Sequence, residues 1–131
     1  MNNKLCVCTS SKAFAMCCQP FLSGVKQAKT PVQLMRSRFS AYALSGHGAY
    51  LLRTWLPSSS IGLSEFELSQ ASLNWQRLSI VDKSQFGDSG RVEFKAYFLD
   101  ISGKQQLHHE ISEFRRISGL WYYAQGHVLS K

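Results

Sequence analysis

RVEFKAYFLD, residues 91–100, alternates apolar and polar side chains, and this alternation indicates a strand with one buried face. Phe94, Ala96 and Phe98 fall on one side of such a strand. The residues that fall on the opposite side are Glu93, Lys95 and Tyr97. Because successive side chains of a strand point to opposite faces, the segment predicts a sheet with one face against a core and the other toward solvent.

Three further segments rich in β-branched and aromatic residues accompany this one. They are WQRLSIVD (75–82), QLHHEISEFRRI (106–117) and LWYYAQGHVLS (120–130). The connections FGDSG (86–90), SGK (102–104) and SG (118–119) have the composition of tight turns. Strands joined by tight turns pair in antiparallel hairpins, so the chain from residue 75 onward predicts an antiparallel sheet.

The residues before the sheet predict helices. Thr30 is a suitable N-cap, and Pro31 occupies the favoured first helical position. Gln33 completes a capping box with Thr30, and a helix is therefore expected over residues 31–44.

Two shorter helices are expected between this helix and the sheet. One spans residues 50–55 and ends before Pro57. The other begins after Ser64, with Glu67 as its capping-box partner. Helices followed by an antiparallel sheet predict an α+β fold in which the helices cover one face of the sheet.

All four cysteines lie in CVCTSSKAFAMCC, residues 6–18, as the pairs Cys6 with Cys8 and Cys17 with Cys18. Zinc favours four soft ligands in a tetrahedron, and a short loop that joins two cysteine pairs can supply them. Adjacent cysteines in a first helical turn lie about 100° apart, so both can reach one ion. The spacing therefore predicts a zinc knuckle with all four cysteines as metal ligands.

Other interpretations of the cysteines stay open. A disulfide between the neighbours Cys17 and Cys18 would close a strained ring, and a bridge between the two pairs is disfavoured in a reducing compartment. Four buried structural thiols are a further possibility. A C-x-x-C redox motif does not occur in the sequence.

The basic residues are unevenly distributed. The net charge is +7, and residues 1–64 contain seven lysines and arginines but no acid. Such an excess can form an electropositive face for nucleic acid, an acidic protein or lipid headgroups. It can also offset the charge of about −2 that four thiolates leave around one Zn²⁺. We favour the second interpretation, because the bases are scattered rather than grouped in runs.

The sequence gives no sign of membrane association. It contains no run of about 18 apolar residues, so a transmembrane helix is not expected. The residues TSSK (9–12) interrupt any apolar stretch that could serve as a signal peptide. A cytoplasmic location is therefore expected.

Several stretches resemble known families. The C-x-C-x8-C-C spacing is similar to the SEC-C zinc motif. The YchJ family of uncharacterised bacterial proteins resembles this chain in CCQPFLSG (17–24), TPVQLMRSRFSAYALSGHGAYLLRTWLP (30–57), VEFKAYF (92–98) and HHEISEFRRISGLWYYAQG (108–126). The resemblance implies a zinc knuckle over residues 1–24 and a cone-shaped, nuclear transport factor 2-like (cystatin-like) α+β domain over 25–131. Where the family tends to read H-E-R-S-R-F, this chain has arginine at neither position 111 nor 113.

Arg38 is an unusual residue for its place in the expected helix. On a helical wheel it falls near the centre of the apolar face, whereas Arg36 points away. A buried arginine needs a carboxylate or a wet cavity. The family's arginines at 111 and 113 imply that this strand face is exposed, which directs Glu110 inward. We therefore expect an ion pair of Arg38 with Glu110 rather than with Glu93.

The same reasoning predicts a pocket inside the cone. Its candidate lining residues are Arg38, Tyr42, Trp55, Trp75, His108, Glu110, Ser112 and Trp121. The ion pair could serve only to fix the helix on the sheet. It could also form the polar floor of a small-molecule site, in which His108 and Glu110 are a conceivable acid/base pair.

Three functions follow from these observations, in order of preference. The first is a cytoplasmic zinc-binding adaptor whose partner is a protein or another anionic molecule. The second is a small-molecule pocket protein or acid/base enzyme that uses Arg38 and Glu110. The third is nucleic-acid binding through the basic first half, which rests on charge alone.

Overall fold

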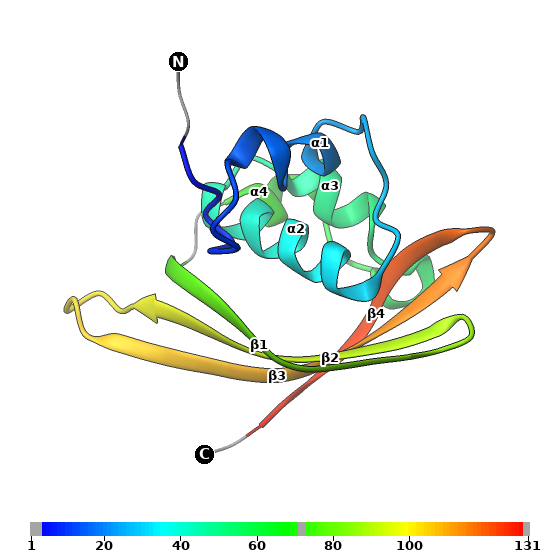
Figure 1. The fold of residues 1–131 in the computed structure, drawn as a ribbon. Coiled ribbons are helices and arrows are strands. Elements are labelled where there is room, and N and C mark those ends of the chain that lie inside the picture. Colours follow the sequence, from blue (N-terminus) through cyan, green and yellow to red (C-terminus); the bar gives the residue numbers. More distant parts are fainter. Residues whose placement is uncertain (1–3, 71–72, 130–131) are drawn as a thin grey trace.

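The computed structural model of the chain describes residues 4–70 and 73–129. Short helices and turns form the first half and strands form the second half (Figure 1). The helices are η1 (Phe14–Met16), α1 (Gln19–Leu22), α2 (Pro31–Leu44), α3 (Gly48–Arg53), η2 (Pro57–Ser59) and α4 (Glu65–Ser69). The strands are β1 (Asn74–Phe86), β2 (Ser89–Leu99), β3 (Gln105–Ile117) and β4 (Leu120–Val128).

The strands form one curved antiparallel sheet in the order β1-β2-β3-β4. The helices lie together on the concave side of this sheet, and α2 crosses above its centre (Figure 1). The inner residues of β2 are Val92, Phe94 and Ala96, all of which are buried. The α+β fold with helices over one sheet face is thus confirmed.

The helix α2 begins and ends where the capping pattern predicts. The Thr30 hydroxyl accepts a hydrogen bond from the Gln33 backbone N–H at 3.1 Å, and Gln33 Oε1 accepts one from the Lys29 N–H at 2.7 Å. The first bond satisfies one of the backbone donors left free at the helix start, and the second ties the Gln33 side chain to the residue before the N-cap.

The other two helices also form. The helix α3 is displaced by two residues, because it begins at Gly48 rather than at residue 50 and ends at Arg53 rather than at residue 55. A side chain at Gly48 would overlap the Glu65 carbonyl oxygen, so the glycine permits α3 and α4 to approach closely. The helix α4 starts as expected, because the Ser64 hydroxyl accepts from the Glu67 N–H at 3.1 Å.

The main core joins the cysteine segment to the rest of the fold. Cys6, Cys8 and Cys18 are buried in the same apolar cluster as Leu34 of α2 and Phe114 of β3. The division of the chain at residue 24 stays a prediction. None of the described helices is long and apolar enough to cross a lipid bilayer.

Candidate functional site

The cysteine segment folds back on itself in a small hairpin. Backbone bonds run from Cys6 N to Lys12 O at 2.8 Å and from Phe14 N to Lys4 O at 2.9 Å. Thr9 and Ser11 adopt positive φ angles of 61° and 76° to close the loop. Cys18 then stands as the N-cap residue of α1. The hairpin therefore brings the first cysteine pair against the start of this helix.

The four sulfurs meet at one point. All four Sγ atoms of Cys6, Cys8, Cys17 and Cys18 lie within 4.8 Å of one another. The separation is 3.7 Å between Cys8 and Cys17 and 3.9 Å between Cys17 and Cys18. A tetrahedron with metal–sulfur bonds of about 2.3 Å has sulfur–sulfur edges of roughly 3.8 Å. The cysteines are not disulfide-bonded, and their donor set and spacing fit a metal ion.

Polar groups surround the sulfurs. Ser10 Oγ lies 3.1 Å from Cys17 Sγ, and Ser40 Oγ lies 3.6 Å from Cys6 Sγ. Arg36 NH1 donates to the Cys8 carbonyl oxygen at 2.9 Å and lies 3.7 Å from Cys8 Sγ. Such outer contacts orient ligands and offset part of the thiolate charge.

The sulfurs also influence one another's acidity. Hydrogen bonding to Cys18 and Cys8 lowers the pKa of the Cys6 thiol, whereas the same bond to Cys6 raises the pKa of Cys18. Burial raises the pKa of Cys17. The cluster by itself thus stabilises one thiolate at the cost of its neighbours, and four thiolates together require a cation.

Sequence reasoning missed the parts that Arg36 and Ser40 play beside this cluster. The two residues are four apart, so they lie on one face of α2, and this face is turned toward the cysteine hairpin. The sequence signal that could have revealed this role is the spacing of two polar residues, Arg36 and Ser40, about one helical turn apart. Arg36 does point away from the sheet-facing side, as expected.

A second site lies between α2 and the sheet, as a cavity of about 270 Å³. All the predicted lining residues except Trp121 surround it: Arg38, Tyr42, Trp55, Trp75, His108, Glu110 and Ser112. The residues that sequence reasoning did not place there are Met35, Phe39, Leu73, Phe94, Ala96 and Tyr123. The cavity is therefore mostly aromatic, with a few polar groups.

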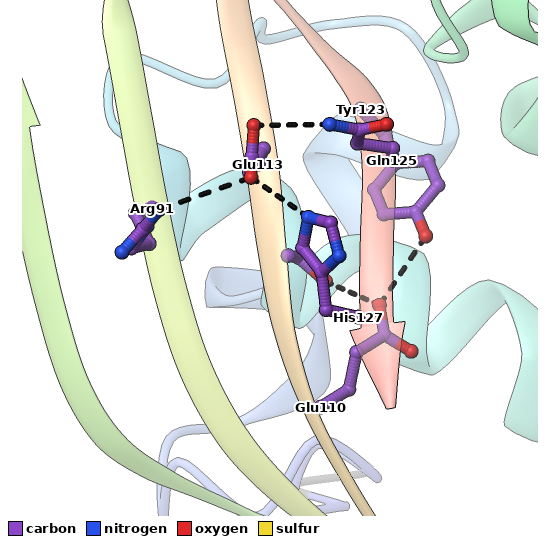
Figure 2. Close-up of polar contacts among 7 residues, drawn as sticks. Arg91, Glu110, Glu113, Tyr123, Gln125 and His127 are labelled. Atoms are coloured by element: carbon purple, nitrogen blue, oxygen red, sulfur yellow. Dashed lines mark hydrogen bonds and ion pairs between the residues drawn. The ribbon is translucent and has the colours of Figure 1, made fainter. Parts of the chain in front are cut away.

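Glu110 is the centre of a hydrogen-bond network in this cavity. His108 Nε2 lies 2.8 Å from Glu110 Oε1, and Glu110 Oε2 accepts from Ser112 Oγ at 2.6 Å and from the Tyr123 hydroxyl at 3.2 Å. Figure 2 shows Glu110 and Tyr123 pointing toward each other from neighbouring strands. Burial raises the pKa of Glu110, but the hydrogen bonds from His108 and Ser112 outweigh it, and the net direction is downward.

The predicted ion pair of Arg38 with Glu110 does not form. Arg38 NH1 donates instead to the Leu51 carbonyl oxygen at 2.8 Å and to Thr54 Oγ1 at 2.7 Å. Its guanidinium carbon lies 4.7 Å from the ring centroids of both Trp55 and Tyr123. Because Tyr123 contacts both the guanidinium and Glu110, its side chain takes the place that a direct ion pair would need. Glu93 pairs with His109 at 2.7 Å, so it is not the partner of Arg38 either.

A bulge follows Tyr123 in β4 and sets the direction of the residues after it. The register between β3 and β4 shifts so that Glu113 pairs with Gln125 but Phe114 pairs with Tyr123, which leaves Ala124 as the extra residue. Gln125 and His127 then contact Glu113, while Tyr123 contacts Glu110 (Figure 2).

The prediction for Trp121 was wrong. The Trp121 ring is buried near Gly90. The guanidinium carbon of Arg116 lies 5.0 Å from the centroid of this ring. The residue lines a separate cavity of about 130 Å³ with Tyr50 and Leu120. The sequence analysis included Trp121 among the lining residues, but the sequence does not tell at which end of the cone the side chain lies.

Replacing Glu110 with glutamine is expected to remove an acid-sensitive contribution to stability. The pKa of Glu110 is lowered from its ordinary value of 4.5, so the ionised carboxylate stabilises the fold above pH 4.5. This contribution is lost as the pH falls below that value. The difference in free energy of unfolding between wild type and Glu110→Gln should therefore shrink from pH 7 to pH 3 in urea titrations. A difference that stays constant over this range would contradict the assigned network.

Comparison with protein families places the sheet and its main helix in a known group. The family model described as "YchJ, middle NTF2-like domain" matches residues 30–126. A UPF0225 protein of Photorhabdus laumondii is 38% identical over 128 residues, which cover 94% of this chain and 80% of that protein. The UPF0225 protein YchJ of Shigella dysenteriae is 36% identical over 128 residues, covering 95% of this chain and 83% of the relative.

The solved structures add a match that includes the cysteine segment. The solution structure of a SEC-C motif containing protein from Rhodopseudomonas palustris is 35% identical and superposes with a TM-score of 0.87. The match covers 99% of this chain and 100% of the other. The similarity therefore extends over the cysteine hairpin as well as over the domain behind it.

Proposed function

This chain belongs to the YchJ (UPF0225) family of bacterial proteins, and we propose that it is a cytoplasmic zinc-binding adaptor. The four cysteines hold one structural Zn²⁺, and the basic surface beside them binds an acidic segment of a partner protein. The observation that supports this most directly is the convergence of the four sulfurs within 4.8 Å.

The donor set favours zinc in a structural role. Four thiolates are soft ligands that suit Zn²⁺, and a site with four protein ligands leaves no coordination position for substrate. Cys6, Cys8 and Cys18 are buried and only Cys17 is half-buried, which suits a closed site. When bound, zinc would supply a fixed link between the cysteine hairpin and the start of α1.

Such a link would also fix the hairpin on the domain behind it. Arg36 and Ser40 join the cysteine residues to α2. Thr9 Oγ1 lies 3.0 Å from the Leu78 carbonyl oxygen and accepts from the Leu78 N–H at 3.1 Å, which joins the loop to β1. The metal would therefore hold the position of the surface that the hairpin presents.

That surface contains a basic groove. Lys12, Lys26 and Arg36 line it together with Met16 and Phe21. Of these three cations, Arg36 is the one whose side chain hydrogen-bonds a cysteine residue, and neither lysine forms an ion pair among the described residues. The lysines thus remain available to a partner, beside a methionine that is 79% exposed. Cations next to an adaptable apolar side chain suit an acidic, partly apolar peptide.

Fluorescence anisotropy with a labelled peptide of alternating glutamate and leucine would test the groove. The wild-type protein should bind this peptide in a salt-sensitive manner and bind the matching glutamine–leucine peptide more weakly. The double variant Lys12→Glu/Lys26→Glu should bind about tenfold more weakly, since each reversal replaces an attraction by a repulsion. The matched control is Lys83→Glu/Lys104→Glu, whose lysines are exposed but do not line the groove.

The control separates a local site from an effect of net charge. An equal loss of affinity in both double variants would overturn the groove as the binding surface. Preferential binding of single-stranded RNA over the acidic peptide, lost in Lys12→Glu/Lys26→Glu, would replace the protein partner by nucleic acid. The acidic peptide is favoured because Phe21 is the only aromatic residue lining the described groove, which provides little surface for stacked bases.

A further inference from the structure

We propose that the cavity between α2 and the sheet binds a small organic carboxylic acid with a flat apolar body, and that Arg38 receives its carboxylate. This inference is independent of the metal site and of the basic groove. It rests on three observations: a buried arginine without a carboxylate partner, two aromatic rings on one side of its guanidinium, and the aromatic walls of the cavity.

Arg38 is buried without an acid against it. The residue is 3% exposed, and no carboxylate of the described residues lies within ion-pair distance of its guanidinium. Its Nη1 nitrogen donates hydrogen bonds to the Leu51 carbonyl oxygen and to Thr54 Oγ1, and the Tyr42 hydroxyl is a further polar neighbour. A buried cation in this state is costly unless an anion or strong acceptors complete its contacts. Because Arg38 also lines the cavity, a ligand there can complete them.

Glu110 does not fulfil this role. Its carboxylate already accepts hydrogen bonds from His108, Ser112 and Tyr123. Tyr123 contacts Arg38 with its ring and Glu110 with its hydroxyl, which keeps the two charges apart. The negative charge of Glu110 also repels a second carboxylate, so the ligand's anionic end is directed to the Arg38 side of the cavity.

The surroundings of Arg38 select how an anion can approach. Trp55 and Tyr123 each place a ring centroid 4.7 Å from the guanidinium carbon, and the two centroids are 5.2 Å apart, so both rings lie on one side of the guanidinium. Both hydrogen bonds to Leu51 and Thr54 come from Nη1, so the edge with Nε and Nη2 is available to a ligand. Carboxylates bind arginine through this edge, in the plane of the guanidinium and with two parallel hydrogen bonds. The arrangement therefore suits a carboxylate better than a neutral amide or alcohol.

The remaining walls suit a flat apolar body. Phe39, Phe94 and Trp75 line the cavity, and the Trp75 ring packs edge-on against Phe39 at a centroid distance of 5.8 Å. Leu73 is 40% exposed and the His108 side chain is 32% exposed, so these two residues mark the side that opens to solvent. A ligand can thus enter past Leu73 with its carboxylate leading toward Arg38.

Benzoate and benzamide are matched probes for this site, since they differ in charge but hardly in shape. Two-dimensional NMR of the full chain should show saturable shifts of the Trp55 and Trp75 indole signals with benzoate. Benzamide should bind at least about tenfold more weakly, because charge-assisted hydrogen bonds are roughly twice as strong as neutral ones. Arg38→Lys should weaken benzoate binding about tenfold, because an ammonium cannot form the in-plane pair of bonds.

Two further variants locate the site. Arg53→Lys changes an arginine outside the cavity and should leave the benzoate affinity unchanged. Leu73→Trp alters a solvent-exposed side chain and should block entry without disturbing the core, so it tests the site even if Arg38→Lys does not fold. The proposal is overturned if benzoate does not bind, if benzamide binds equally well, or if Leu73→Trp leaves the affinity for benzoate unchanged.

Discussion

Cys8→Ser is expected to fail to bind the proposed zinc ion and to unfold at a temperature at least about 10 °C lower than the wild type. Cys8 is completely buried and its sulfur belongs to the four-sulfur cluster, and a serine hydroxyl is a harder ligand that suits zinc less than a thiolate. Ligation by structural zinc contributes directly to folding free energy, and ~3 kcal/mol corresponds to a shift of roughly 10 °C in a chain of this size. Elemental analysis and differential scanning calorimetry measure the two effects.

Ser10→Ala is a suitable control for this experiment. Ser10 Oγ lies 3.1 Å from Cys17 Sγ but is not one of the four sulfur ligands. The variant should keep one zinc per chain, with a smaller change in melting temperature. Cys8→Ser protein that still holds one equivalent of zinc would contradict ligation by all four cysteines.

Phe114→Ala is expected to lower the free energy of unfolding by about 3–5 kcal/mol, because it opens a cavity in the centre of the core. Phe114 is among the largest fully buried side chains, and its ring packs edge-on against Tyr123 at a centroid distance of 5.9 Å. The substitution should therefore also loosen the tyrosine that joins Arg38 and Glu110.

Urea denaturation provides the measurement, and Phe86→Ala provides the control. Phe86 is 90% exposed at the end of β1, so the same change of side chain should alter stability by no more than about 0.5 kcal/mol. The urea midpoint of Phe114→Ala should fall without a large change in slope. Similar losses in the two variants would refute the central position assigned to Phe114.

Local signals in the sequence were sufficient for the fold. Thr30 and Gln33 determine where α2 begins, and short-range capping of this kind does not depend on distant residues. The alternation in 91–100 identified the buried face of β2, since strand geometry fixes it. The cysteine cluster could also be predicted from the sequence, because its four candidate ligands lie within thirteen residues, from Cys6 to Cys18.

The details of the cavity depended on long-range geometry that the sequence does not express locally. The burial of Arg38 followed from the helical wheel, but its contacts did not, because Thr54 and Tyr123 are distant in sequence from α2. Gly126 adds to this arrangement: a side chain there would overlap Glu110 and come within 2.6 Å of the Tyr123 hydroxyl. Contacts between separate elements thus decide which groups meet across the cavity.

The contact between Thr9 and Leu78 has a consequence for solubility. The strand β1 is at the edge of the sheet, where unpaired backbone groups can recruit a strand from another molecule. Thr9 Oγ1 binds both the N–H and the carbonyl oxygen of Leu78, and so occupies two of these groups as a neighbouring strand would. The cysteine hairpin therefore covers this part of the β1 edge, and a metal that held the hairpin in place would also keep these groups from pairing with another molecule.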